Sequence, residues 1–245
     1  MKEREKLKSR LGFILISAGC AIGIGNVWKF PYIAGNGGGG AFVLCYLIFL
    51  VILGLPVMTM EFAVGRASQK SPVKAYQALE KPGQKWHIHG YITVIGCYLL
   101  MMFYTTVSGW MLHYFYLTAT GKFAGLDADQ VGGVFTEMLS QPLVMAFWMI
   151  VVVAIGIFVC SRGLQNGLEK ITKVMMLALL AIMVVLAINS IMMDGAAEGL
   201  KFYLIPDFGR MKELGIGYTI VTAMNQAFFT LSLGIGAMAI FGSYI

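Results

Sequence analysis

Long, nearly uninterrupted apolar stretches dominate this sequence and restrict it to a membrane-spanning fold. Hydrophobic residues make up 58% of the 245 residues and charged residues only 12%, whereas a typical globular domain carries about 25% charged residues. The apolar residues fall into runs of the ~20 residues that a helix needs to cross a bilayer. We expect about six spans, near residues 11–34, 41–66, 88–117, 142–161, 167–192 and 215–245.

Basic residues are distributed unevenly between the loops that join these spans. If the N-terminus is cytoplasmic, most of them fall on the cytoplasmic side, and the loops outside hold Lys122, Lys201, Arg210 and Lys212. This bias follows the positive-inside rule and predicts that both ends of the chain are cytoplasmic. We therefore expect a cytoplasmic tail over residues 1–10 and a transmembrane domain over residues 11–245. The net charge of +6 then reflects topology, and no nucleic-acid partner is expected.

The polar residues contain no recognisable catalytic set, which argues against a membrane enzyme. The sequence shows no paired catalytic carboxylates, no Ser-His-Asp set and no P-loop. Its four cysteines lie inside the apolar runs without metal-ligand spacing. We therefore predict that the protein is not an enzyme.

Two spans carry the same glycine motif in the middle of the membrane. Gly23-Ile24-Gly25 interrupts the first span and Gly234-Ile235-Gly236 the last, and each glycine costs about 1 kcal/mol relative to alanine inside a helix. For either motif alone, close helix packing through small residues is a fair alternative. Interrupted spans that cross in opposite directions point instead to two discontinuous helices around a transporter binding site.

Longer motifs closely resemble the neurotransmitter:sodium symporter family, in its bacterial amino-acid branch. They are the segments 19–32, 36–42, 60–66, 103–104 with Trp110, and 226–234. The resemblance implies an all-α integral membrane protein with the leucine-transporter type of fold: its first five-helix inverted repeat plus the first helix of the second repeat, with helices one and six broken. It covers the whole chain but stops where the family's sixth helix ends, so we expect a fragment.

The resemblance implies sodium-coupled symport of a neutral amino acid by alternating access across the cell inner membrane. An inactive or regulatory membrane fragment of such a transporter is the alternative. The implied partners are the amino-acid substrate, the lipid bilayer, and either further copies of the chain in a homo-oligomer or a missing C-terminal half.

Two sodium sites follow from carrying the family motif over position by position. The Ala21 carbonyl, the Asn26 side chain and Thr230 would form the first site, and the carbonyls of Gly19 and Ile22 would contribute to the second. Without the motif, Asn26 would be a capping residue beside a helix break and Thr230 a hydroxyl bonded to its own helix.

The implied substrate site lies between the two breaks. Its residues are Cys20, Ala21, Gly23, Ile24, Gly25, Leu100, Tyr104, Phe229, Thr230, Ser232 and Ile235. Tyr104 would bind the substrate carboxylate, and Leu100 lies one helical turn away on the same face. Monoamine members of the family carry an acidic residue at the position of Gly23, so glycine favours an amino acid. Because no residue of the pocket is charged, a hydrophobic or aromatic side chain would suit it.

Gating and other polar positions also follow from the resemblance. Lys29 stands where the family has an arginine in the outer gate, but it lacks the bidentate fork of arginine; the alternative is a lysine that snorkels to the interface. Arg4 and Tyr244 match the cytoplasmic gate. Glu61 matches a structural position, although intramembrane carboxylates often carry protons. Chloride dependence stays open, because Tyr46, Gln226 and Thr230 match chloride-site positions but the deciding residue lies in a seventh helix that the sequence lacks.

Overall fold

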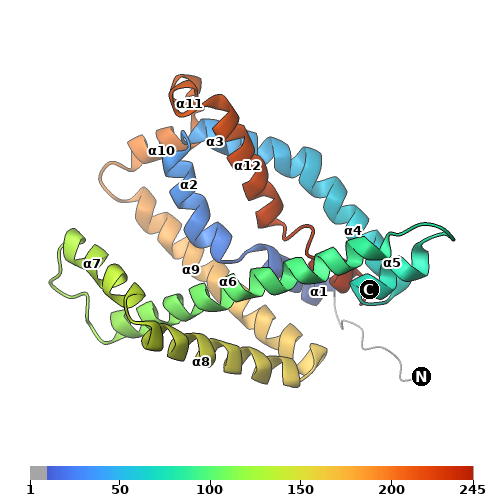
Figure 1. Cartoon of the computed structure of the whole chain (residues 1–245). Helices are drawn as coiled ribbons and strands as arrows, with labels where there is room; N and C mark the ends of the chain where they lie inside the picture. The colour runs from blue at the N-terminus through green and yellow to red at the C-terminus, as the bar shows by residue number, and fades with distance from the viewer. Residues whose placement is uncertain (1–9, 245) are drawn as a thin grey trace. The chain divides into compact units, whose positions relative to one another are not determined.

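Helices and short π-helical turns form nearly all of the regular structure in this chain (Figure 1). The computed structural model describes residues 10–244, except for the side chains of residues 10, 11 and 164–166. The chain divides into two compact units. Unit 1 comprises residues 1–94 and 164–245, and unit 2 comprises residues 95–163.

Unit 1 holds both ends of the described chain. Its elements are α1 (Arg10–Ala21), η1 (Gly25–Lys29), α2 (Phe30–Asn36), α3 (Gly40–Phe49), η2 (Leu50–Gly54), α4 (Leu55–Ser68), α5 (Pro72–Leu79), the first turns of α6 (His87–Ala119), η3 (Leu164–Glu169), α9 (Lys170–Ile191), α10 (Ala196–Leu204), α11 (Phe208–Leu214), α12 (Ile216–Thr230) and α13 (Ala237–Gly242). The three η segments are π-helical. Unit 2 holds the rest of α6 with α7 (Ala128–Leu139) and α8 (Pro142–Ser161).

Five of the predicted spans coincide with helical segments able to cross a membrane. Four are continuous helices that are long and apolar enough, Gly40–Ser68, His87–Ala119, Pro142–Ser161 and Gly167–Ile191, and a bent pair, Gly12–Ala21 with Gly25–Asn36, would make a fifth. In α8 and α9, whose residues the structure describes throughout, no residue is buried. Helices that are apolar on all sides suit a lipid environment, so the predicted all-α membrane class is confirmed.

The first span is broken where the sequence places its glycine motif. α1 ends at Ala21, η1 begins at Gly25, and the two helical parts meet at 52°. Inside the break the Gly23 amide donates to the Ala21 carbonyl at 3.2 Å, and the Asn26 amide donates to the Gly23 carbonyl at 3.0 Å. These short-range bonds replace the regular helical ladder, which confirms the predicted discontinuity.

The sixth span is broken over residues 231–236, between α12 and α13. These helices have only 15 and 6 residues, so neither is long enough to cross a membrane by itself. Gly234 and Gly236 have φ of +82° and +70°, and Ser232 has φ of +51°. Glycine adopts such values readily, whereas they are uncommon for serine. The broken sixth helix is therefore confirmed, and Ser232 is held in a strained conformation.

Close backbone approaches fix the elements on both sides of this break. On the α12 side of the break, α3 packs against α12 around a buried core of Ala34, Phe42 and Ala223. On the other side, α13 packs on α4 so closely that a Cβ on Gly65 would meet the carbonyl group of Ala239. Glycine is required there because nothing larger fits between two backbones.

Four short helices lie in segments that the sequence assigns to the loops between spans. α5 begins at Pro72, inside the basic segment 68–85, and proline suits the first turn of a helix. α10 and α11 lie in the last outer loop, where an isolated bridge joins Gly39 to Pro206. In unit 2, loop 118–141 contains α7, which Asp127 and Gln130 open with a reciprocal capping box. The polar composition of these segments hides their helical turns.

Candidate functional site

The two helix breaks of unit 1 lie against each other and bring together most of the predicted site residues. The Ser232 hydroxyl donates to the Cys20 carbonyl at 2.9 Å. This bond joins the break between α12 and α13 directly to the end of α1. The Gln226 side chain donates from Nε2 to the Gly25 carbonyl at 3.2 Å. The Cys20 carbonyl at the end of α1 and the Gly25 carbonyl at the start of η1 each receive a side-chain donor from the sixth span, and the Gly25 carbonyl also accepts from the Phe30 amide.

The three predicted ligands of the first sodium site are joined by hydrogen bonds. Asn26 donates from Nδ2 to the Ala21 carbonyl at 2.7 Å, and its Oδ1 accepts from the Thr230 hydroxyl at 2.8 Å. The Tyr46 hydroxyl in turn donates to the Thr230 hydroxyl at 3.2 Å. A carbonyl, an amide and a hydroxyl oxygen are thus gathered from both breaks, and hard cations prefer oxygen ligands of this kind.

Residues predicted for the second sodium site lie at the end of α1. Gly19 packs against α9, because a Cβ there would lie 2.9 Å from Cγ2 of Thr172 and 3.3 Å from Met176. The Ile22 amide still donates to the Ala18 carbonyl, at 2.6 Å, so the helix ends just before the break. The Gly19 carbonyl therefore lies in the last turn of α1, and the Ile22 carbonyl lies just beyond the end of this helix.

Phe229 forms one wall of the site and covers the first break. A Cβ on Gly25 would lie 2.5 Å from Cδ1 of the Phe229 ring, so the ring rests directly on the glycine backbone. Nζ of Lys29 lies 5.1 Å from the centroid of this ring, within the range of a cation–π interaction. The predicted gating lysine and the predicted wall residue are therefore in contact.

For the remaining predicted residues, the structure gives the element on which each one lies. Gly23 and Ile24 lie in the first break, and Ile235 lies in the second. Leu100 and Tyr104 lie on the part of α6 that belongs to unit 2, so their place in the site stays a prediction. Tyr244 follows α13, and Arg4 lies outside the described residues, so the cytoplasmic gate also stays a prediction.

Two contacts of this region were not foreseen in their present form. The carboxylate of Glu61 accepts a hydrogen bond from the Gly234 amide at 2.7 Å, inside the break of helix six. The signal was an acidic residue within an apolar span, which the family resemblance assigned to a structural position. Gln226, noted only as a chloride-site match, bonds the backbone of the first break.

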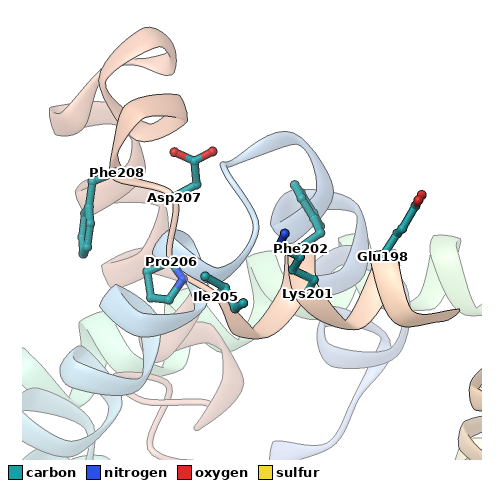
Figure 2. A pocket seen from close by; sticks show the side chains of 7 residues that line it. All are labelled: Glu198, Lys201, Phe202, Ile205, Pro206, Asp207 and Phe208. Atoms are coloured by element: carbon teal, nitrogen blue, oxygen red, sulfur yellow. The ribbon is translucent and has the colours of Figure 1, made fainter. Parts of the chain in front are cut away.

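A separate hollow of about 430 Å³ lies on the loop between α10 and α11 (Figure 2). Its lining residues are Glu198, Lys201, Phe202, Ile205, Pro206, Asp207 and Phe208. None of them is a predicted site residue, so this hollow is distinct from the site at the breaks. Among the described residues, no group of three or more His, Cys, Asp or Glu side chains is arranged to hold a metal ion.

Sequence comparison matches this chain to known proteins over nearly its whole length. The model of the sodium:neurotransmitter symporter family matches residues 4–131 and 133–245. An uncharacterized sodium-dependent transporter of Bacillus subtilis is 39% identical over 97% of this chain and 51% of its own length. A second, from Methanocaldococcus jannaschii, is 34% identical over 99% of this chain and 50% of its own length.

A solved structure shows the same fold. The crystal structure of MhsT in complex with L-phenylalanine superposes with a TM-score of 0.88 and 38% sequence identity, covering 99% of this chain and 54% of MhsT. The chain therefore spans about half the length of the proteins it matches.

Proposed function

Because this chain belongs to the sodium:neurotransmitter symporter family, we propose that it takes part in sodium-coupled transport of a neutral amino acid by alternating access. The proposal places it in a cell inner membrane with the N-terminus in the cytoplasm. It takes residues 1–10 as the cytoplasmic tail and residues 11–245 as the transmembrane domain.

One observation carries the proposal: oxygens from both breaks meet at one point. Ala21, Asn26 and Thr230 are linked by hydrogen bonds of 2.7 and 2.8 Å although they come from opposite ends of the chain. A sodium ion that replaced these hydrogen bonds would be bound by the carbonyl, amide and hydroxyl oxygens. Because it would draw on both breaks, its binding would be linked to their relative position, and such linkage is what coupling requires.

The neighbouring residues support an amino-acid substrate with a neutral, apolar side chain. The Phe229 ring lies directly on the backbone of Gly25 and offers an aromatic wall at the first break. MhsT, which has the same fold, was solved with L-phenylalanine, and this favours an aromatic substrate. The proposed site residues are Cys20, Ala21, Gly23, Ile24, Gly25, Leu100, Tyr104, Phe229, Thr230, Ser232 and Ile235.

Other elements of the family mechanism complete the proposal. Gly19 and Ile22 would contribute carbonyls to a second sodium site. Lys29 would close the outer side through its contact with Phe229, and Arg4 with Tyr244 would close the cytoplasmic side. Chloride is left out of the proposal, because some relatives are named as chloride-dependent and others are not.

Equilibrium binding of a pool of radiolabelled amino acids tests the proposal directly. The purified, detergent-solubilised chain should bind at least one of them in sodium but not when potassium replaces it. Thr230→Val should abolish this binding, because it removes a sodium ligand and keeps the shape of the side chain. Thr59→Val is the matched control, since Thr59 is exposed and bonds only the carbonyl of Leu55 on its own helix.

Three outcomes separate the readings. Sodium-dependent binding that survives in Thr230→Val would contradict the sodium assignment. Equal binding in both salts would contradict coupling. If the folded chain binds no amino acid in either salt, the alternative of an inactive or regulatory membrane fragment is favoured.

A further inference from the structure

A carboxylate with one unsatisfied oxygen lies buried at the break between α12 and α13. Glu61 on α4 is only 9% exposed, and its Oε1 accepts the Gly234 amide at 2.7 Å. Its Oε2 is also buried and accepts no hydrogen bond within 3.5 Å from the residues that the structure describes, although the backbone amides of Met238 and Ala239 also act on the carboxylate. A buried carboxylate with one oxygen left unpaired is costly as an anion. Gaining a proton removes that charge without moving the backbone.

Two titratable side chains near the surface interact electrostatically with this carboxylate. Tyr76 of α5 is partly buried, and both this burial and the negative charge of Glu61 raise the pKa of its hydroxyl. His89, in the first turn of α6, is exposed and acts electrostatically on Glu61. The two rings touch edge to face, with centroids 5.1 Å apart. The exposed His89 ring therefore contacts the Tyr76 ring, and both groups interact with the charge of the buried carboxylate.

Other charged groups around Glu61 do not neutralise it. Lys74 on α5 and Arg66 on α4 are both exposed. The break and α13, which pack against α4, present only backbone amides, because residues 231–242 include no charged side chain. Within the described part of unit 1, Tyr76 and His89 are therefore the titratable neighbours of the carboxylate.

We propose that Glu61 is a reversible proton-binding site that exchanges protons with the surface between α5 and α6 through Tyr76 and His89. Tyr76 would give its hydroxyl proton to Oε2 and take one from the His89 imidazolium, which had gained it from water. Oε2 would then belong to a neutral carboxylic acid, and Tyr76 and His89 would both end neutral. Oε1 continues to accept from Gly234, but this bond loses the strength that a charged acceptor gives. Protonation would thus loosen the break that carries Ser232 and its bond to Cys20.

This inference rests on the contacts of Glu61, so it can be tested without sodium or amino acid. Infrared difference spectra of the solubilised chain between alkaline and acidic pH report the carbonyl stretch of each carboxylic acid that forms. Wild type should show a band typical of a buried acid, and Glu61→Gln should lose it. Glu213→Gln is the matched control, because Glu213 lies exposed on α11 and its loss should leave this band unchanged.

Either of two results would overturn the site assignment: wild type forms no buried carboxylic acid over the accessible pH range, or Glu61→Gln retains the band. Failure of amino-acid binding would not affect this reading. Should Glu61→Gln fold poorly, Tyr76→Phe and His89→Gln provide a second test because they leave the packing of α4 on α13 intact. Both should slow the response of the band to a pH jump, and a response as fast as that of wild type would refute the proposed path.

Discussion

Replacing Gly25 with alanine should disturb the site through a single steric contact. The new Cβ would lie 2.5 Å from Cδ1 of Phe229 and closer still to Cε1, whereas ordinary contact begins at 3.4 Å. The backbone of η1 cannot yield without disturbing the Gln226 bond to the Gly25 carbonyl. The Phe229 ring must therefore move, and it would leave its position under Lys29.

The magnitude follows from these two contacts. Overpacking a well-packed site typically costs about 1–3 kcal/mol, and loss of an exposed cation–π contact costs about 0.5–1 kcal/mol. The free energy of unfolding of Gly25→Ala should therefore fall by ~2 kcal/mol or more. Moving the aromatic wall would change the shape of the proposed substrate site in the same step.

Sodium-dependent binding and thermal unfolding of the Gly25→Ala chain provide the measurements. Gly35→Ala is the control, because no described atom lies within 4 Å of a Cβ at that position of α2. A second change, Phe229→Leu, should restore part of the stability of Gly25→Ala by making room for the methyl group. If Gly25→Ala binds and unfolds like wild type, the contact between the glycine backbone and the ring is wrong.

Gly65→Ala should lower the free energy of unfolding by about 1–3 kcal/mol, because its Cβ would meet the backbone carbonyl of Ala239, which cannot swing aside; denaturant titration measures this. Thr230→Val should lower it by about 1–3 kcal/mol per hydrogen-bonding group left unpaired in the same titration. Desolvation raises the pKa of Glu80, but hydrogen bonds from the His87 backbone and ring outweigh it and lower that pKa. Hydrogen exchange should therefore show loop 80–87 opening as pH falls through the folded-state pKa of Glu80, since a lowered pKa stabilises the fold only above that range.

Each of these predictions has a matched control. Gly96→Ala should be neutral, because no described atom lies within 4 Å of a Cβ there, and equal losses at Gly65 and Gly96 would disprove the close seam between α4 and α13. Thr59→Val should be nearly neutral beside Thr230→Val. In Glu80→Gln the acid-dependent opening of the loop should disappear; if it persists, another group controls that loop.

The sequence predicts the parts of the fold that depend on local chemistry. The Gly-Ile-Gly motifs in two apolar spans predicted both breaks, because glycine is unfavourable inside a continuous helix. The π-helical turns η1 and η2 were not predicted, since their pattern of hydrogen bonds leaves no mark on the spacing of apolar residues. The helices α10 and α11 were missed because their polar composition is that of a loop.

For the candidate site, residue types could be predicted but not their bonding. Asn26 and Thr230 were named from the family motif, yet their hydrogen bond joins positions 204 residues apart. Only tertiary packing determines such a pair. The unsatisfied oxygen of Glu61 is equally invisible in the sequence, because it depends on which backbone amides of the sixth helix face α4.

The bridge between Gly39 and Pro206 holds the loop that precedes α11 and α12 against the start of α3. At Gly40, a Cβ would lie 2.5 Å from the Ile205 carbonyl oxygen, so the loop in front of α12 is pressed onto the start of α3. Farther along, Phe42 and Ala223 hold α12 to the same helix. We therefore expect α12 to stay fixed on α3 while α13 moves together with α4 about residues 231–236. Distances between spin labels on α12 and α13 would measure this movement.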